Sequence, residues 1–183
     1  MRSSSYAPQT AEALIETIPI SGNLDHFWKD LLELEENGDI IKTRFGTYGL
    51  PEKMGLVVGR FQLTSKGFGF VIPDNKGERP DVFIPPRALG GAMNNDRVMA
   101  RVESSSGGNK PEGEIIRIIT HANNKIVGIF HQSGDFGFVT PDDKRIGQDI
   151  YIMKRHFGGA KTNQKVVAEI TEWPVERRNA EGK

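Results

Sequence analysis

The feature that most constrains the fold is an internal repeat. Residues 58–103 and 127–171 follow one pattern. Equivalent residues are 68 positions apart, as in the pairs Phe68 and Phe136, Pro73 and Pro141, and Asp81 and Asp149. A repeated pattern in one chain indicates repeated units of structure. We therefore expect two copies of one small fold, placed one after the other.

Each copy has the pattern of short strands joined by tight turns. Runs rich in Val, Ile, Phe and Tyr alternate with Gly, Pro, Asn and Asp, and no long helical period interrupts them. The predicted strands are near residues 56–63, 67–72, 80–84, 97–103 and 113–119 in copy one, and near 125–131, 135–140, 149–152 and 165–173 in copy two. Residues 104–111 are expected to form a loop before the last strand of copy one. This strand pattern predicts a mainly β chain with two tandem five-stranded OB-fold barrels.

The first 55 residues have a different pattern. Residues 11–16 and a segment from Asn23 to Asn37 have helical spacing, and Gly38 supplies a helix stop. Residues 40–50 predict a tight hairpin around Phe45 and Gly46. A helix followed by a hairpin is typical of the second half of a winged-helix domain, although residues 17–23 are too few for a middle helix. We therefore expect a small α+β winged-helix-like segment.

These patterns divide the chain into five parts. They are a disordered N-terminus at residues 1–9, the winged-helix-like segment at 10–54, OB barrel 1 at 55–121, OB barrel 2 at 122–175, and a C-terminal tail or linker at 176–183.

The composition excludes several kinds of site. The chain has no cysteine, which excludes disulfides, thiolate zinc sites and cysteine nucleophiles. None of its four histidines has a histidine partner at the i, i+4 spacing of a helical metal site. Asp142 and Asp143 lack nearby acidic partners, so we interpret them as a solvated turn and not as a centre for metal-dependent hydrolysis. We expect no catalytic residue, no metal and no cofactor in this chain.

Charge is unevenly distributed along the chain. Of the 24 basic and 24 acidic residues, residues 1–56 contain 5 and 9, which leaves 19 and 15 in residues 57–183. A basic excess in the repeated part permits a polyanionic partner. No apolar run approaches the roughly 20 residues that span a bilayer, and the N-terminus has no signal-peptide pattern. We expect a cytoplasmic protein without a membrane partner.

Aromatic residues at matched positions in the two copies predict a binding surface. The strand period of two places Phe68 and Phe70 on one face and Val71 on the other. We expect Gly67 and Gly69 to keep the aromatic face low, so that nucleobases stack on the rings. The predicted RNA-binding residues of copy one are Arg60, Phe61, Lys66, Phe68, Phe70, Phe83 and Arg87, and those of copy two are Phe136, Phe138, Tyr151, Lys154, Arg155 and His156. The alternative is that these aromatic residues fill the barrel cores.

Residues 66–71 fit two nucleic-acid-binding signatures. They match the start of the RRM signature, but that fold needs two packing helices, which the intervening sequence does not predict. Together with residues 81–84, they resemble the paired RNA-binding motifs of bacterial cold-shock proteins, whose OB barrel fits the strand pattern better. Leu63 and Pro85 depart from this resemblance, since single-domain cold-shock proteins carry tryptophan and histidine there.

A wider resemblance extends over roughly residues 10–175. The motifs at residues 48–51, 59–73, 81–86 and 95–98 resemble the N-terminal region of the ribonuclease R branch of the ribonuclease II family. The resemblance implies a processive 3′-to-5′ exoribonuclease of structured RNA, whose cold-shock domains hold and feed the strand. It also implies that a magnesium-dependent nuclease domain and an S1 domain would follow this segment as partners in the same polypeptide.

Three functions remain open from the sequence. The first is an RNA-holding and RNA-feeding region of such an exoribonuclease, not itself an enzyme. The second is a stand-alone cold-shock-type RNA chaperone or regulator. The third is a protein-interaction adaptor, in which the aromatic residues would meet a partner chain.

Overall fold

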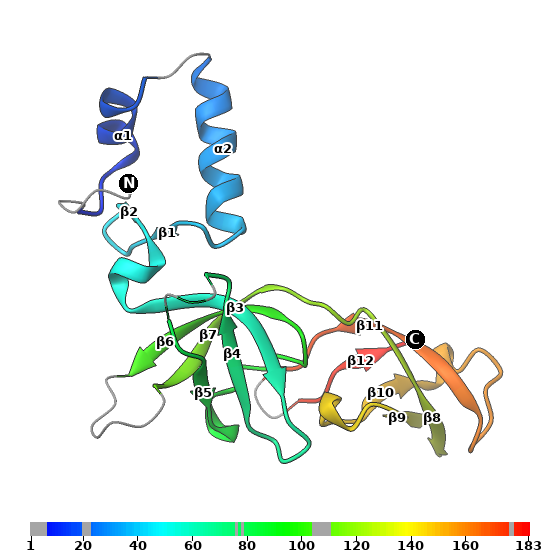
Figure 1. The fold of residues 1–183 in the computed structure, drawn as a ribbon. Coiled ribbons are helices and arrows are strands. Elements are labelled where there is room, and N and C mark those ends of the chain that lie inside the picture. The colour runs from blue at the N-terminus through cyan, green and yellow to red at the C-terminus, as the bar shows by residue number, and fades with distance from the viewer. Residues whose placement is uncertain (1–6, 20–22, 76, 78, 104–110, 176–177) are drawn as a thin grey trace.

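A helical segment and two barrels follow one another along the chain (Figure 1). The computed structural model describes residues 7–19, 23–75, 77, 79–103, 111–175 and 178–183. Within these residues, no helix is long and apolar enough to cross a membrane.

The N-terminal segment contains two helices and a short hairpin. Helix α1 (Ala11–Thr17) begins where the side chain of Thr10 accepts a hydrogen bond from the backbone N–H of Ala13. Helix α2 (Leu24–Glu36) is capped in the same way by Asn23. Strands β1 (Ile41–Lys42) and β2 (Tyr48–Gly49) form the predicted hairpin. This segment has its own small core, made of Ala11, Leu14, Leu31, Ile40, Tyr48 and Leu50.

Residues immediately before α1 are part of this segment. The backbone of Gln9 pairs with Tyr48 through two hydrogen bonds of 2.7 and 3.1 Å. The prediction of a disordered N-terminus was therefore wrong for residue 9, while residues 1–6 lie outside the described part of the chain. Gln9 lies beside β2 because the hairpin leaves one strand edge free to accept a third segment.

The predicted strands of copy one form barrel 1. Its strands are β3 (Leu56–Leu63), β4 (Gly69–Pro73), β5 (Val82–Ile84), β6 (Arg97–Glu103) and β7 (Glu112–Thr120). They close in the order β3-β4-β5-β7-β6, with β5 and β7 parallel and all other pairs antiparallel. The loop predicted at residues 104–111 falls between β6 and β7, mostly outside the described residues.

Barrel 2 repeats this topology. Its strands are β8 (Lys125–Ser133), β9 (Phe136–Pro141), β10 (Ile150–Met153), β11 (Lys165–Glu172) and β12 (Glu181–Gly182). They close in the equivalent order, with β10 and β12 as the parallel pair. The prediction of two tandem five-stranded barrels in a mainly β chain is confirmed.

The C-terminal residues correct one predicted boundary. Strand β12 completes barrel 2, because Glu181 pairs with Tyr151 and Gly182 pairs with Ile152. Ala180 is fully buried in the barrel core. The interpretation of residues 176–183 as a tail or linker was therefore wrong. A two-residue strand of Glu and Gly has no β-type pattern of its own, and only closure of the barrel makes it a strand.

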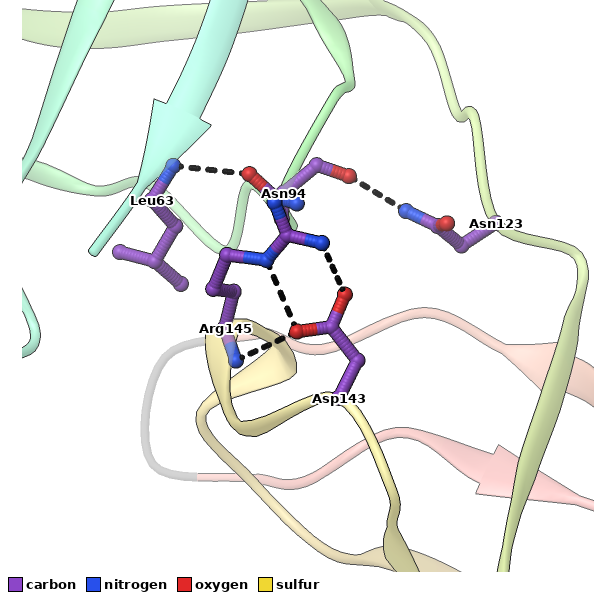
Figure 2. A network of polar contacts seen from close by, with 5 residues as sticks. All are labelled: Leu63, Asn94, Asn123, Asp143 and Arg145. Carbon is purple, nitrogen blue, oxygen red and sulfur yellow. Dashed lines mark hydrogen bonds and ion pairs between the residues drawn. The ribbon is translucent and has the colours of Figure 1, made fainter. Parts of the chain in front are cut away.

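The two barrels meet at a packed junction formed by residues 93–96. Met93 precedes β6 of barrel 1, but its buried side chain belongs to the core cluster of barrel 2. Asn94 is also buried; its side chain accepts a hydrogen bond from the backbone N–H of Leu63 (3.0 Å), and its carbonyl oxygen accepts one from Asn123 (Figure 2). Buried polar groups that are fully hydrogen-bonded fix geometry. The junction therefore holds one barrel against the other.

Asp96 is the second buried polar residue of this junction. Its carboxylate accepts hydrogen bonds from the backbone N–H groups of Met93 and Ala122, both 2.9 Å long. It also lies 3.0 Å from the Nδ1 atom of His121. The ring of His121 stacks on Trp173 of barrel 2 at a centroid distance of 3.5 Å. The link between the barrels is thus tied to both of them.

Candidate nucleic-acid interface

The aromatic residues predicted for barrel 1 form one cluster on its outer face. The first aromatic cluster consists of Phe68, Phe70 and Phe83, whose ring centroids lie 5.6–5.9 Å apart. All three side chains are half-buried, whereas Val71, the next residue after Phe70 on β4, is completely buried. This alternation is the one expected from a strand period of two. The prediction that Phe68 and Phe70 share a face opposite Val71 is therefore confirmed.

Strand register explains how residues distant in sequence meet in this cluster. Phe70 on β4 lies directly opposite Phe83 on β5 and, on its other side, opposite Gln62 on β3. Gln62 is exposed and adds an amide beside the rings. We did not predict it, because a glutamine in a strand carries no signal until the register places it next to Phe70.

Barrel 2 carries the equivalent second aromatic cluster, made of Phe136, Phe138 and Tyr151. Its ring centroids lie 5.4–5.9 Å apart, close to the spacing in barrel 1. Phe138 lies opposite Tyr151 on one side and opposite His131 on the other. His131 is exposed and, like Gln62, was missed by the sequence analysis. The matched geometry shows that both copies of the repeat build the same surface.

The glycine between the two phenylalanines has a different role from the predicted one. A Cβ atom on Gly69 would lie 2.3 Å from Cε2 of Phe61, inside the barrel. In the same way, a Cβ atom on Gly137 would lie 2.5 Å from Cε2 of Phe130. Gly69 therefore makes room for a core ring and does not lower the outer surface. Gly67 lies in the preceding turn with φ of +84°, a conformation that favours glycine.

Phe61 was wrongly included among the binding residues. Its side chain is completely buried and belongs to the core cluster of barrel 1, as Phe130 does in barrel 2. Leu63 is also in the core, and Pro85 is buried next to β5. These two positions therefore add nothing to the stacking surface. Phe61 and Phe130 are thus core residues, whereas the aromatic clusters lie on the outer faces.

The predicted cations of barrel 1 lie on or next to the strands that carry the first aromatic cluster. Lys66 is exposed in the turn that precedes Phe68, and Arg60 is exposed on β3, two residues before Gln62. Arg87 follows β5 and forms an ion pair of 2.9 Å with Glu112, with 79% of its side chain exposed. Of these three predicted cations, Arg87 is thus partly neutralised.

Arg87 also lines a cleft of about 840 Å³ between the two barrels. The other arginine of the cleft, Arg178, is paired with Glu181 at 3.0 Å. The cleft therefore presents arginines that already have acidic partners, whereas Lys66 and Arg60 form no ion pair among the described residues.

The predicted cations of barrel 2 lie at the end of β10. Lys154, Arg155 and His156 form one short 3₁₀ turn that follows Met153, and Met153 lies opposite Phe136. Lys154 donates a hydrogen bond to the carboxylate of Asp135, and this contact lowers the pKa of Asp135 below its usual range. Asp135 leads the aromatic run of copy two, where copy one has Lys66. Barrel 2 therefore presents less free positive charge next to its rings.

The acidic pair considered in the sequence has other contacts. Asp143 accepts hydrogen bonds from Arg145, as Figure 2 shows, and this interaction lowers the pKa of the Asp143 carboxyl below its usual range. Asp142 pairs with Lys165 at 2.8 Å. In the described residues, no cluster of three or more acidic or histidine side chains has the arrangement of a metal site.

Two protein-family models match the two barrels. The model described as Ribonuclease B OB domain matches residues 59–118, and the model described as Cold shock domain matches residues 138–183. The second match extends over β12, in agreement with its place in barrel 2.

The curated relatives are ribonuclease R proteins of several bacteria. The protein of Thermotoga maritima is 36% identical over 154 residues, which are 82% of this chain and 21% of that protein. The protein of Vibrio parahaemolyticus is 31% identical over 179 residues, covering 96% of this chain and 21% of the relative. The Escherichia coli protein is 29% identical over 178 residues, with shares of 96% and 22%. The chain spans about a fifth of the length of these relatives.

Solved structures share the fold. Mycoplasma genitalium RNase R in complex with ribose methylated single-stranded RNA matches with a TM-score of 0.61 and 18% identity, over 69% of this chain and 20% of that chain. Yeast Ssd1, a pseudonuclease, matches with a TM-score of 0.58 and 15% identity, over 72% of this chain and 22% of that chain. In sequence and in fold, this chain corresponds to the N-terminal OB and cold-shock region of ribonuclease R.

Proposed function

We propose that the chain binds single-stranded RNA on the outer faces of its two barrels and does not cleave it. The observation that carries this proposal is the repeated aromatic cluster, which has the same ring spacing on both barrels. Aromatic residues on an outer sheet face offer flat surfaces on which successive bases stack. Such stacking is tolerant of sequence, because every base has an aromatic face.

Charge favours barrel 1 as the stronger of the two sites. Lys66 and Arg60 lie beside the first aromatic cluster, whereas Lys154 of barrel 2 is held by Asp135. A lysine that is already paired with a carboxylate contributes less to the attraction of phosphates than an unpaired one. Barrel 2 then acts mainly as a second stacking surface at a fixed position relative to barrel 1.

Similarity to ribonuclease R supports a role within a longer polypeptide. We propose that the barrels hold an RNA strand and feed it to a nuclease domain and an S1 domain of the same protein, in the cytoplasm. Magnesium would serve that nuclease domain and is not needed for RNA binding by this chain. Chelation by EDTA should accordingly leave the RNA affinity of the chain unchanged.

Alanine substitutions at the cluster test the binding surface. Phe68→Ala and Phe83→Ala should each weaken binding of a fluorescent oligouridylate, measured by anisotropy, by about 1–3 kcal/mol. Their melting temperatures should change little. Ile116→Ala is a matched control, because Ile116 is an exposed aliphatic residue on another strand of barrel 1. Unchanged RNA affinity in both phenylalanine variants would refute the stacking surface.

A cleavage assay tests the second half of the proposal. The purified chain, incubated with end-labelled RNA and magnesium, should leave the RNA at full length. Shortening from the 3′ end that persists after further purification, and is abolished by a substitution in this chain, would contradict it.

A further inference from the structure

The hairpin of the N-terminal segment carries an exposed aromatic residue that the two barrels do not explain. The hairpin tip comprises residues 43–47, between β1 and β2. Phe45 at this tip is 76% exposed, more than any other large hydrophobic residue in the described part of the chain. Phe45 is not part of the core of this segment, so its ring is open to a ligand.

The backbone of the tip is held rigidly. The Oγ1 atom of Thr43 accepts hydrogen bonds from the backbone N–H groups of Phe45 (3.2 Å) and Thr47 (3.3 Å). The two threonine hydroxyls also lie 2.7 Å apart. Gly46 closes the turn with φ of +76°, and its N–H donates to the carbonyl of Thr43 (3.0 Å). The backbone that carries Phe45 is therefore ordered before any ligand binds, which lowers the entropic cost of binding.

The charge of the hairpin favours a polyanion. The guanidinium carbon of Arg44 lies 4.8 Å from the ring centroid of Phe45, and the ammonium of Lys42 lies 5.5 Å from that of Tyr48. Residues 41–49 contain no acidic residue. Within the described part of the chain, neither Lys42 nor Arg44 takes part in an ion pair.

Helix α2, another exposed apolar surface described in the N-terminal segment, lacks this combination. Helix α2 also exposes apolar side chains, including Trp28 and Leu32, but it contains five acidic residues and one lysine. An acidic helix repels phosphates, so its apolar row is not suited to RNA. Of helix α2 and the hairpin, only the hairpin combines an exposed aromatic ring with cations and no acidic residue.

We infer that the hairpin tip is a third RNA contact, in which Phe45 stacks on an unpaired base while Arg44 and Lys42 neutralise neighbouring phosphates. The contact rests on the proposed RNA-binding function, but it uses none of the barrel residues. The segment is anchored to barrel 1, because Arg117 of β7 donates a hydrogen bond of 3.2 Å to the carbonyl of Glu35 and Arg97 of β6 donates one to that of Asn37. Both contacts hold the end of α2, which leads into the hairpin, against barrel 1.

Two measurements on the intact chain test this inference. Phe45→Ala should weaken binding of a single-stranded oligoribonucleotide by about fivefold, the lower end of the range for one stacked base. Phe45→Trp should retain the affinity, because it retains a stacking ring. Photo-crosslinking of an oligonucleotide that contains 4-thiouridine, followed by mass spectrometry, should identify Phe45 or a neighbour in the tip. Leu32→Ala is the matched control, since it removes a side chain that is 56% exposed on the acidic helix.

The outcomes separate this inference from the barrel proposal. Loss of affinity in Phe68→Ala together with wild-type affinity in Phe45→Ala and no crosslink at the tip would overturn the third contact alone. Equal loss in Leu32→Ala and Phe45→Ala would show a general effect of the segment and would also overturn it. Wild-type affinity in Phe68→Ala and Phe83→Ala, with a loss in Phe45→Ala, would refute the barrel surface and leave the tip as the RNA contact.

Discussion

The close approach between Gly69 and Phe61 leads to a quantitative prediction about stability. A Cβ atom on Gly69 would lie 2.3 Å from Cε2 of Phe61 and 2.6 Å from the carbonyl oxygen of Gln62. Carbon atoms in contact are normally about 3.5–4.0 Å apart, so Gly69→Ala requires a shift of more than 1 Å. Phe61 is completely buried, and Gly69 is paired with Leu63 in the sheet. A shift of the ring would disturb the core, and a shift of the backbone would disturb the pairing of β3 with β4.

We expect Gly69→Ala to destabilise the chain by about 3 kcal/mol, the upper end of the range for overpacking a core. For a chain of this size, about 1 kcal/mol corresponds to about 2–4 °C, so the melting temperature should fall by about 6–12 °C. Circular dichroism or differential scanning fluorimetry measures this change. The double variant Gly69→Ala with Phe61→Leu should be more stable than the sum of the two single changes predicts, because leucine lacks the ring atoms that clash.

Two results would refute this reasoning. A melting temperature equal to that of the wild type would show that Gly69 does not face the core. Weaker RNA binding in Gly69→Ala at a temperature where the protein is folded, with no loss of stability, would restore the earlier interpretation that this glycine keeps the outer surface low.

Three further predictions concern the junction, the C-terminus and the charge beside barrel 2. Met93→Ala should cost about 2–5 kcal/mol and should lower the melting temperature of barrel 2, although Met93 lies in the loop of barrel 1, as site-resolved hydrogen exchange would show. Deletion of residues 179–183 removes β12 and should open barrel 2 to limited proteolysis, whereas a tail would be lost without effect. Asp135→Asn should free Lys154 and strengthen RNA binding by barrel 2, with the slope of log affinity against log salt steeper by about 0.7. In the wild type, Asp135 should stop neutralising Lys154 only in acid, as the pH falls through the lowered pKa of Asp135. The RNA affinity should therefore be constant near neutral pH.

Much of this fold was predictable because its signals are local. The helix from Leu24 to Glu36 and the hairpin around Phe45 have caps, turns and periods that act within a few residues. The nine strands predicted in the barrels agree with β3–β11 to within about two residues at most ends, as strand boundaries allow. The repeat also predicted that Phe68 and Phe136 would lie at equivalent places, because equivalent sequences adopt equivalent strand pairings.

Two of the failures share one cause, which is that strand pairing across the barrel is not a local property. Gln62 and His131 joined the aromatic faces only through their register with Phe70 and Phe138. Phe61 went into the core because β3 alternates its side chains between the two sides of the barrel wall. The same alternation places Arg60 and Gln62 outside, so the prediction of Phe61 as a binding residue was wrong.

The sequence by itself determined that the chain has two copies of a small β-barrel, a helical segment before them, and aromatic residues at matched positions. It did so because composition, turns and periodicity act over short distances. Only the tertiary structure decided that Glu181 and Gly182 close barrel 2, that Met93 packs in the core of the neighbouring barrel, and that Gly69 makes room for Phe61. Each of these depends on contacts between residues far apart in the chain, whose energies arise only when the barrels are closed and packed.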